Sequence, residues 1–166
     1  MPIRPIPCLL LAVSLAACRT PVPQEELSVA DVEAYWAIDS AVGDRQYIAP
    51  VVRFRATNKS KEAQTSVQAT ASFRRKGEEG IDWGSGWVEV NSRKKPLAPG
   101  QSTLVTMKSD GRYYSSGDPE TFFEHKLFKD ARVTVFIRIG SSGWEKFAEL
   151  DVPRHIGSKG LAESAR

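Results

Sequence analysis

The stretch 66-SVQATASFR-74 decides the fold, because its side chains alternate strictly between apolar and polar. Four apolar side chains share one face: Val67, Ala69, Ala71 and Phe73. Four polar side chains share the other: Gln68, Thr70, Ser72 and Arg74. Successive side chains of a strand point to opposite faces of a sheet, so this alternation predicts a strand with one buried face and one face in water.

The same two-residue period recurs along the chain. It is clear in 51-VVRFRATN-58 and in 132-RVTVFIRI-139. Weaker strand candidates lie at 32–39, 87–90, 102–108 and 144–152. Turn signals separate these segments, among them Pro99-Gly100, where proline fixes φ at the first central position of a type II turn and glycine accepts a positive φ at the second. About seven short strands at this spacing predict an all-β fold, an antiparallel β-sandwich.

One segment, 118-DPETFFEHKLFKDA-131, breaks this rhythm and predicts a short inserted helix. Asp118 suits the N-cap and Pro119 suits the first turn. On a helix, one apolar stripe would face the sandwich: Phe123, Leu127 and Ala131. Phe122 and Phe128 fall outside this stripe, so we expect at least one of them to stay partly exposed.

Several features between residues 50 and 107 occur together: Asn58-x-Ser60, the alternation from Val67 to Phe73, Gly77, Trp87 and Leu97-Ala98-Pro99-Gly100-Gln101-Ser102. In combination they resemble the immunoglobulin-like domain of small envelope lipoproteins, the group that includes FxLYD-type domains. The resemblance implies an immunoglobulin-like fold more than a function. The sequence departs from the family pattern at 74–76, Arg-Arg-Lys, and after Asp110.

Residues 1–17 predict a signal peptide. Arg4 is followed by the uncharged run 8-CLLLAVSLAA-17, which is shorter than the roughly 20 apolar residues that span a bilayer. Leu15-Ala16-Ala17-Cys18 resembles the lipobox of bacterial lipoproteins at all four positions, which implies cleavage before Cys18 and lipidation of its thiol with acyl chains such as palmitate. The alternative is an ordinary signal cut after Ser14-Leu15-Ala16, which would leave a secreted protein with a free thiol.

Lipidation of Cys18 would hold the protein at a membrane through two or three acyl chains, each buried methylene contributing roughly 0.8 kcal/mol. By the same resemblance, Arg19, in place of an aspartate, favours the outer membrane with the domain facing the periplasm. Residues 18–27 predict a tether, because TPVPQEE has two prolines and almost nothing to bury. We expect one domain over 28–155 and a flexible tail over 156–166.

Composition and motifs point away from catalysis. Lys and Arg number 23 against 20 Asp and Glu, and a formal net charge of +3 implies neither nucleic acid nor an acidic polymer as partner. Cys8 leaves with the predicted signal, which excludes a disulfide, a thiol nucleophile or a zinc-thiolate site in the mature domain. His125 and His155 are expected at the surface, and the acidic loop 78–82 lacks calcium-ligand spacing. We therefore expect no enzyme, no cofactor and no metal.

Two basic triplets, 74–76 and 93–95, are candidates for binding an anionic polymer. If 66–74 and 83–91 form a hairpin, the triplets lie at its opposite ends. This placement predicts solvated turns rather than one anion-binding patch, although either triplet could touch lipid headgroups or wall polymers.

Aromatic residues are the strongest binding candidates: Trp83, Trp87, Tyr113, Tyr114, Phe122 and Phe128. Such rings stack on glycans and anchor protein partners, but they also close the ends of sandwich cores. The insertion 113–128 lies on a rigid scaffold, where binding is usually located, and its alternative role is to cap the open end of the sandwich. The expected function is a lipid-anchored, non-catalytic accessory domain that binds another envelope protein. The alternatives are a peptidoglycan- or carbohydrate-binding module and a secreted enzyme of unknown type.

Overall fold

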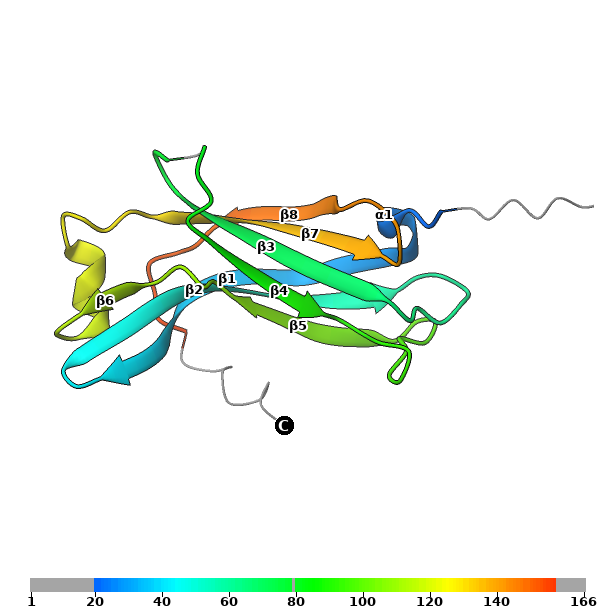
Figure 1. Cartoon of the computed structure of the whole chain (residues 1–166), viewed down its shortest axis with the longest axis horizontal. Helices are drawn as coiled ribbons and strands as arrows, with labels where there is room; N and C mark the ends of the chain where they lie inside the picture. The colour runs from blue at the N-terminus through cyan, green and yellow to red at the C-terminus, as the bar shows by residue number, and fades with distance from the viewer. Residues whose placement is uncertain (1–19, 79, 158–166) are drawn as a thin grey trace, which may run out of the picture.

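The computed structural model describes residues 20–78 and 80–157, and in this part of the chain two antiparallel sheets pack face to face (Figure 1). The strands are β1 (Leu27–Val42), β2 (Arg45–Asn58), β3 (Val67–Arg75), β4 (Gly84–Glu89), β5 (Ser102–Lys108), β6 (Tyr113–Ser115), β7 (Ala131–Ile139) and β8 (Glu145–Asp151). A short α-helix, α1 (Pro23–Glu26), precedes β1, and a 3-10 helix, η1 (Pro119–Glu124), lies between β6 and β7.

The strand order is that of an immunoglobulin-like sandwich. One sheet has the order β1-β2-β5, with β6 also paired to β2, and the other has the order β4-β3-β7-β8. These correspond to strands A, B and E facing strands C′, C, F and G of the immunoglobulin fold. The predicted all-β sandwich is therefore confirmed. It has one strand more than expected, because β6 is only three residues long and too short to show a period.

β3 shows the alternation that the sequence predicts. Its four apolar side chains are fully buried, and its polar face is open to solvent at Arg74. β3 pairs with β4 from Phe73 opposite Gly84 to Gln68 opposite Glu89, so the predicted hairpin is present. The opposing sheet contributes Trp36, Val52 and Phe54 to the same core. Burial of each such side chain stabilises the fold by about 1.5–3 kcal/mol.

The motif Asn58-x-Ser60 closes the end of β2 with a buried amide. Asn58 is 0% exposed. Its Nδ2 donates to the carbonyl oxygens of Glu62 and Leu97, both at 2.8 Å. Its Oδ1 accepts from the backbone N–H of Ser60 at 2.9 Å and from the Ser60 hydroxyl at 2.7 Å. The full capacity of the amide is therefore satisfied, and the side chain fastens the 59–62 loop to the segment before β5.

The predicted type II turn before β5 is present. Gly100 has φ +74°, which suits the second central position after Pro99. The N–H of Gln101 donates to the carbonyl oxygen of Ala98 at 3.0 Å and closes the turn.

The folded body begins earlier than predicted. Within the predicted tether 18–27, Pro23 is buried and Leu27 is only 1% exposed, in the core. The side-chain amide of Gln24 donates to the carbonyl oxygen of Lys146 on β8 at 3.1 Å. Residues from Pro23 onward thus belong to the sandwich, because core burial of Leu27 outweighs the extended preference of a proline-rich segment. Cys18 itself lies outside the described residues.

The body also extends past the predicted boundary at residue 155. The N–H of Trp36 donates to the carbonyl oxygen of His155 at 3.1 Å, and the N–H of Gly157 donates to the carbonyl oxygen of Trp36 at 2.7 Å. This parallel bridge seats Ile156 beside β1, so 156–157 are not part of a tail. The remainder of the predicted tail, 158–166, lies outside the described residues.

No helix in the described ranges combines the length and the apolarity that crossing a bilayer requires.

Candidate functional site

An aromatic groove lies at the end of the sandwich where β6, η1 and the start of β4 meet, opposite the end that carries α1 (Figure 1). Its volume is about 620 Å³. Four aromatic side chains line it: Trp83, Tyr113, Tyr114 and Phe122. Trp83, Tyr113 and Phe122 are half-buried, whereas Tyr114 is 59% exposed. The groove therefore offers ring surface to solvent at this end of the sandwich.

The floor of the groove is a packed cluster around Trp36, which is 0% exposed. The Trp36 ring centroid lies 5.8 Å from that of Tyr113 and 6.2 Å from that of Trp83. The Phe128 ring meets Trp36 edge-on at 5.2 Å. Tilted and edge-on pairs of this kind each add about 0.5–1.5 kcal/mol beyond burial of their area, so the floor is rigid.

The short helix predicted within 118–131 is present, but as the 3-10 helix η1, which covers only Pro119–Glu124. Its hydrogen bonds join residues three apart, such as Thr121 N–H to the Asp118 carbonyl oxygen at 3.1 Å. A 3-10 helix has three residues per turn instead of 3.6, which moves side chains away from their α-helical stripe. The regular turn also ends at Glu124, so the residues that follow take an irregular path to β7.

The stripe predicted for a longer helix is wrong at two positions. Leu127, expected to face the sandwich, is 70% exposed, and Phe128, placed outside the stripe, is 8% exposed in the core beside Phe123. Phe122 is half-buried, which satisfies the expectation that at least one of Phe122 and Phe128 stays partly exposed. The segment thus both caps the core, through its buried rings, and presents apolar surface, through Leu127 and Phe122.

The structure brings together five of the six aromatic residues that the sequence singled out. Four of them line the groove, and Phe128 lies in its floor with its ring centroid 5.3 Å from that of Tyr113. Trp87 is 61% exposed on β4, opposite Thr70 and away from the groove. Sequence reasoning missed Arg75, Arg112 and Leu127 as lining residues. The two-residue period contains a signal for Arg75, since it must point to the opposite face from Arg74 and Lys76.

Two trios of charges flank the groove, each with one more cation than carboxylate. Arg75 Nη2 lies 2.6 Å from Glu78 Oε2, and Lys129 pairs with the same carboxylate. Arg112 Nη1 lies 3.0 Å from Asp39 Oδ2, and Lys108 pairs with that carboxylate too.

Both shared carboxylates stay charged at neutral pH. The hydrogen bond from Lys129 is the main reason that the pKa of Glu78 lies below its usual range. The hydrogen bond from Lys108 does the same for the pKa of Asp39. Each trio therefore keeps its surplus of one positive charge.

A row of stacked side chains, in which two tyrosines lie between two arginines, continues from the groove onto the β1–β2 hairpin. The Arg112 guanidinium lies 4.6 Å from the centre of the Tyr47 ring, and the Tyr47 and Tyr114 centroids are 6.0 Å apart. Arg45 lies 5.5 Å from the centre of the Tyr114 ring. These cation–π contacts orient Arg112 and Tyr114, the two lining residues on this side.

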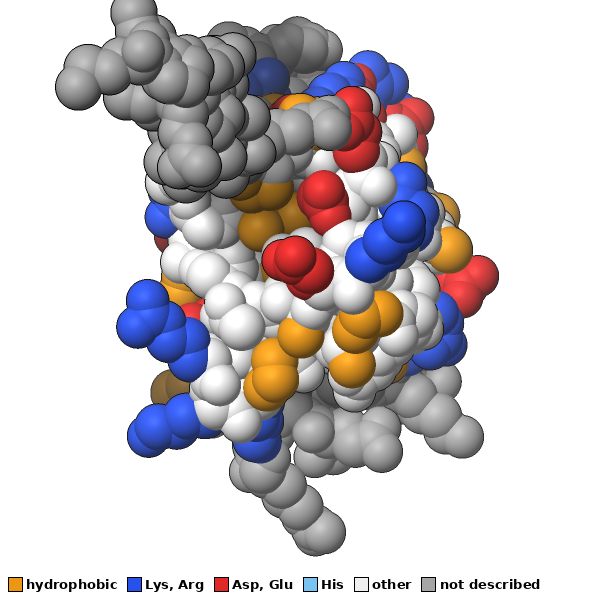
Figure 2. All heavy atoms as spheres, turned by 90° about the vertical axis from the view of Figure 1, so that its right-hand side faces the viewer, with side chains coloured by type: hydrophobic (Ala, Val, Ile, Leu, Met, Phe, Trp, Pro, Cys, Tyr) orange, Lys and Arg blue, Asp and Glu red, His pale blue; other side chains and the backbone are white. Residues whose placement is uncertain are grey.

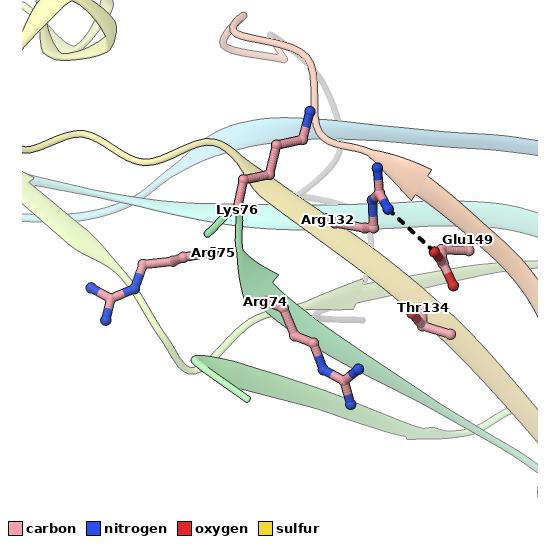
Figure 3. Close-up of a pocket in the computed structure, with 6 residues that line it drawn as sticks. All are labelled: Arg74, Arg75, Lys76, Arg132, Thr134 and Glu149. Atoms are coloured by element: carbon pink, nitrogen blue, oxygen red, sulfur yellow. Dashed lines mark ion pairs between the residues drawn. The ribbon is translucent and has the colours of Figure 1, made fainter. Parts of the chain in front are cut away.

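The basic triplet 74–76 does not form one patch. Figure 3 shows its three side chains pointing in different directions around a shallow hollow that Arg132 and Glu149 also line. Arg74 pairs with Asp82, and Lys76 pairs with Asp151, both at 2.7 Å. The second triplet, 93–95, follows β4 at the opposite end of the β3–β4 hairpin, as predicted. Neither triplet contributes a shared anion site.

The histidines have structural surroundings. His125 Nδ1 accepts the backbone N–H of Leu127 at 3.2 Å, and the His155 ring lies 6.5 Å from that of Tyr35. Residues 20–78 and 80–157 contain no group of three or more His, Cys, Asp or Glu side chains arranged to hold a metal ion.

Comparison with known proteins gives no family. No family model matches the chain, and no curated protein matches it. Two solved structures match the chain at low similarity. A protein labelled ApaA from Bordetella pertussis is 14% identical with a TM-score of 0.36, and the match covers 76% of this chain and 92% of that protein. A protein from Archaeoglobus fulgidus, with 18% identity and a TM-score of 0.36, covers 76% of this chain and 98% of its own. Similarity this low carries no argument about function.

Proposed function

We propose that this protein is a lipid-anchored, non-catalytic accessory domain of the bacterial envelope that binds another envelope protein through the aromatic groove. One observation carries the proposal: the chain enters the sandwich at α1, and the groove lies at the opposite end (Figure 1). With a lipid on Cys18, the groove would face away from the membrane, toward the periplasm when the anchor lies in the outer membrane.

The composition of the groove supports a protein partner. Interfaces are enriched in aromatic and arginine side chains, which the groove provides at Trp83, Tyr114 and Arg112. Leu127 is 70% exposed at its edge, an apolar side chain that a partner would cover. Because the floor is packed, binding would require little reordering of these side chains.

The entry end of the molecule has a different character. Figure 2 views this end, and on the surface not covered by grey atoms it shows acidic and basic side chains interspersed with small, separate apolar areas. Mixed charges of this kind keep a surface solvated. The contrast supports assigning the binding role to the groove.

The carbohydrate-binding alternative rests on a different surface. Trp87 is 61% exposed on the outer face of β4, and Trp144 is 40% exposed beside β8. The Arg138 guanidinium lies 4.6 Å from the centre of the Trp144 ring. Exposed indole rings can stack on sugars. Retention of the wild type on purified peptidoglycan, abolished by Trp87→Ala, would establish this alternative.

The anchor is tested by metabolic labelling with a palmitate analogue. The wild type should carry label in the membrane fraction, and Cys18→Ser should carry none, because only the thiol at this position can form the thioether. Equal labelling of the two forms, or release of the mature wild type into the soluble fraction, would contradict lipid anchoring.

The binding surface is tested by site-specific crosslinking in cells. A photoreactive amino acid in place of Leu127 should give a discrete adduct with one envelope protein, since this side chain lies at the groove edge. The matched control replaces Lys94, which is also exposed but lies at the opposite end of the hairpin. The adduct should disappear with Tyr114→Ala. An adduct of equal yield from both positions, or from neither, would refute the proposed surface.

A further inference from the structure

We infer that the groove receives an acidic peptide segment, with a bulky apolar side chain seated between Arg75 and Arg112 and carboxylates on either side of it. This inference rests on the proposed function, since it names the chemistry of the segment that the partner would insert. It is carried by the charge of the groove, by its unused hydrogen-bond donors and by its apolar centre.

The charge of the groove is one-sided. Among its described lining side chains, Arg75, Arg112 and His125 bring basic groups and none brings a carboxylate. Asp118 and Glu124, the nearby acids of the η1 segment, line a separate hollow together with Arg154 and His155. The carboxylates that do pair with the groove arginines are each shared with a lysine, which leaves one surplus positive charge on each side.

Both guanidinium groups retain donors for a ligand. A guanidinium carries five N–H donors in a planar fork. Arg75 uses Nη2 toward Glu78 and its Nε is buried out of reach of a ligand, so Arg75 offers the donors of Nη1. Arg112 donates to Asp39 through Nη1. The opposite edge of the Arg112 guanidinium matches the two oxygens of a carboxylate, and Nη1 of Arg75 can donate to a second carboxylate of the partner.

Between the arginines the surface is apolar. The Arg75 guanidinium lies 5.8 Å from the centre of the Trp83 ring, and the Trp83 and Tyr113 centroids are 4.8 Å apart. Phe122 continues this surface at 5.3 Å from Tyr113. A large aromatic or aliphatic side chain would therefore bury its area against rings that are already packed from below.

The same features argue against a neutral sugar as the occupant. A polyol presents hydroxyl groups that need acceptors as well as donors. Among the described side chains, the groove's acceptors are hydroxyls and an imidazole, with neither a carboxylate nor a carboxamide beside its two guanidinium donors. Its chemistry fits a ligand that brings its own negative charge.

The test measures fluorescence anisotropy of short labelled peptides with the full-length lipidated protein in detergent. The probe is the acetylated amide Glu-Glu-Trp-Glu-Glu, and its two controls are Lys-Lys-Trp-Lys-Lys and Glu-Glu-Ala-Glu-Glu. The probe should bind about tenfold more tightly than either control, because only the probe combines charge with an anchor. Its affinity should fall as salt rises.

Variants then place the peptide in the groove. Arg112→Gln should weaken binding of the acidic probe about tenfold, whereas Arg93→Gln, a matched loss of charge at the far end, should leave it unchanged. Arg112→Glu should weaken the acidic probe and strengthen the lysine peptide. This gain of binding cannot arise from misfolding.

Three results would overturn the inference: equal affinity for the acidic and lysine peptides, no binding of the probe, or no effect of Arg112→Gln. Displacement of the bound probe by soluble peptidoglycan oligomers would assign the groove to a glycan and also overturn it. If the peptide-binding test fails but crosslinking from position 127 still gives one specific adduct, the proposed function stands and only the acidic-peptide inference is refuted.

Discussion

Replacement of Asn58 by alanine should lower the free energy of unfolding by about 2–4 kcal/mol. The amide makes four hydrogen bonds, two to carbonyl oxygens and two from Ser60, and each contributes about 1 kcal/mol net. The groups of Ser60 are partly exposed and can regain water, which reduces the loss. The carbonyl oxygen of Leu97 keeps the backbone N–H of Gln64 at 2.9 Å, and that of Glu62 keeps the Ser60 hydroxyl at 2.7 Å, so neither is left without a partner and no further desolvation penalty is added.

A second substitution at this site separates hydrogen bonding from volume. Asn58→Asp keeps the shape but replaces Nδ2, which carries both donors, with a single oxygen that faces the carbonyls of Glu62 and Leu97. Burial and these carbonyls should raise the pKa of the introduced carboxyl in the folded state above its unfolded value. The stability that remains is therefore present at acid pH and is lost as pH rises through the folded pKa.

Urea denaturation at pH 7 and at pH 4 measures both effects. Thr57→Ala is the matched control, because this neighbour makes only an exposed hydrogen bond to Ser102, at 2.7 Å, and should cost less than about 1 kcal/mol. A loss below about 1 kcal/mol for Asn58→Ala would refute the reasoning that the buried amide holds the loops together. Equal destabilisation of Asn58→Asp at the two pH values would refute the pKa argument.

Three further predictions follow from local geometry. Gly84→Ala should destabilise the fold by about 3 kcal/mol or more, because the new Cβ would lie 2.1 Å from Ser109 Oγ. Thermal denaturation measures this loss, and Gly80→Ala, whose Cβ would meet nothing within 4 Å, is the nearly neutral control. Gly100→Ala should cost about 1 kcal/mol at φ +74°, and an unchanged melting temperature would exclude the type II turn in solution. Asp39 has a lowered folded pKa, so its contribution is present at neutral pH and is lost as pH falls through the acid range; Asp39→Asn should flatten that part of the stability curve.

The alternation of residues 66–74 was sufficient to predict β3, because the burial of every second side chain follows from the local geometry of a strand. The same reasoning located the other six predicted strands and the turn at Gly100. The aromatic surplus also identified Trp83, Tyr113, Tyr114 and Phe122 as candidates, since their number exceeds what the strand faces can bury. Their meeting at one end of the sandwich was not readable from the sequence.

Tertiary structure decided which residues form the groove. Tyr113 and Tyr114 reach it because β6 pairs with the start of β2, a contact between residues distant in the chain. This pairing places them beside Trp83, which lies at the turn end of the predicted β3–β4 hairpin. The helical stripe failed for a similar reason: packing of Phe128 against Trp36 favoured a short 3-10 turn and turned Leu127 outward. The sequence determined the fold class through local side-chain periodicity. The site required the tertiary structure, because its geometry depends on strand pairing and on which rings fill the shared end of the core.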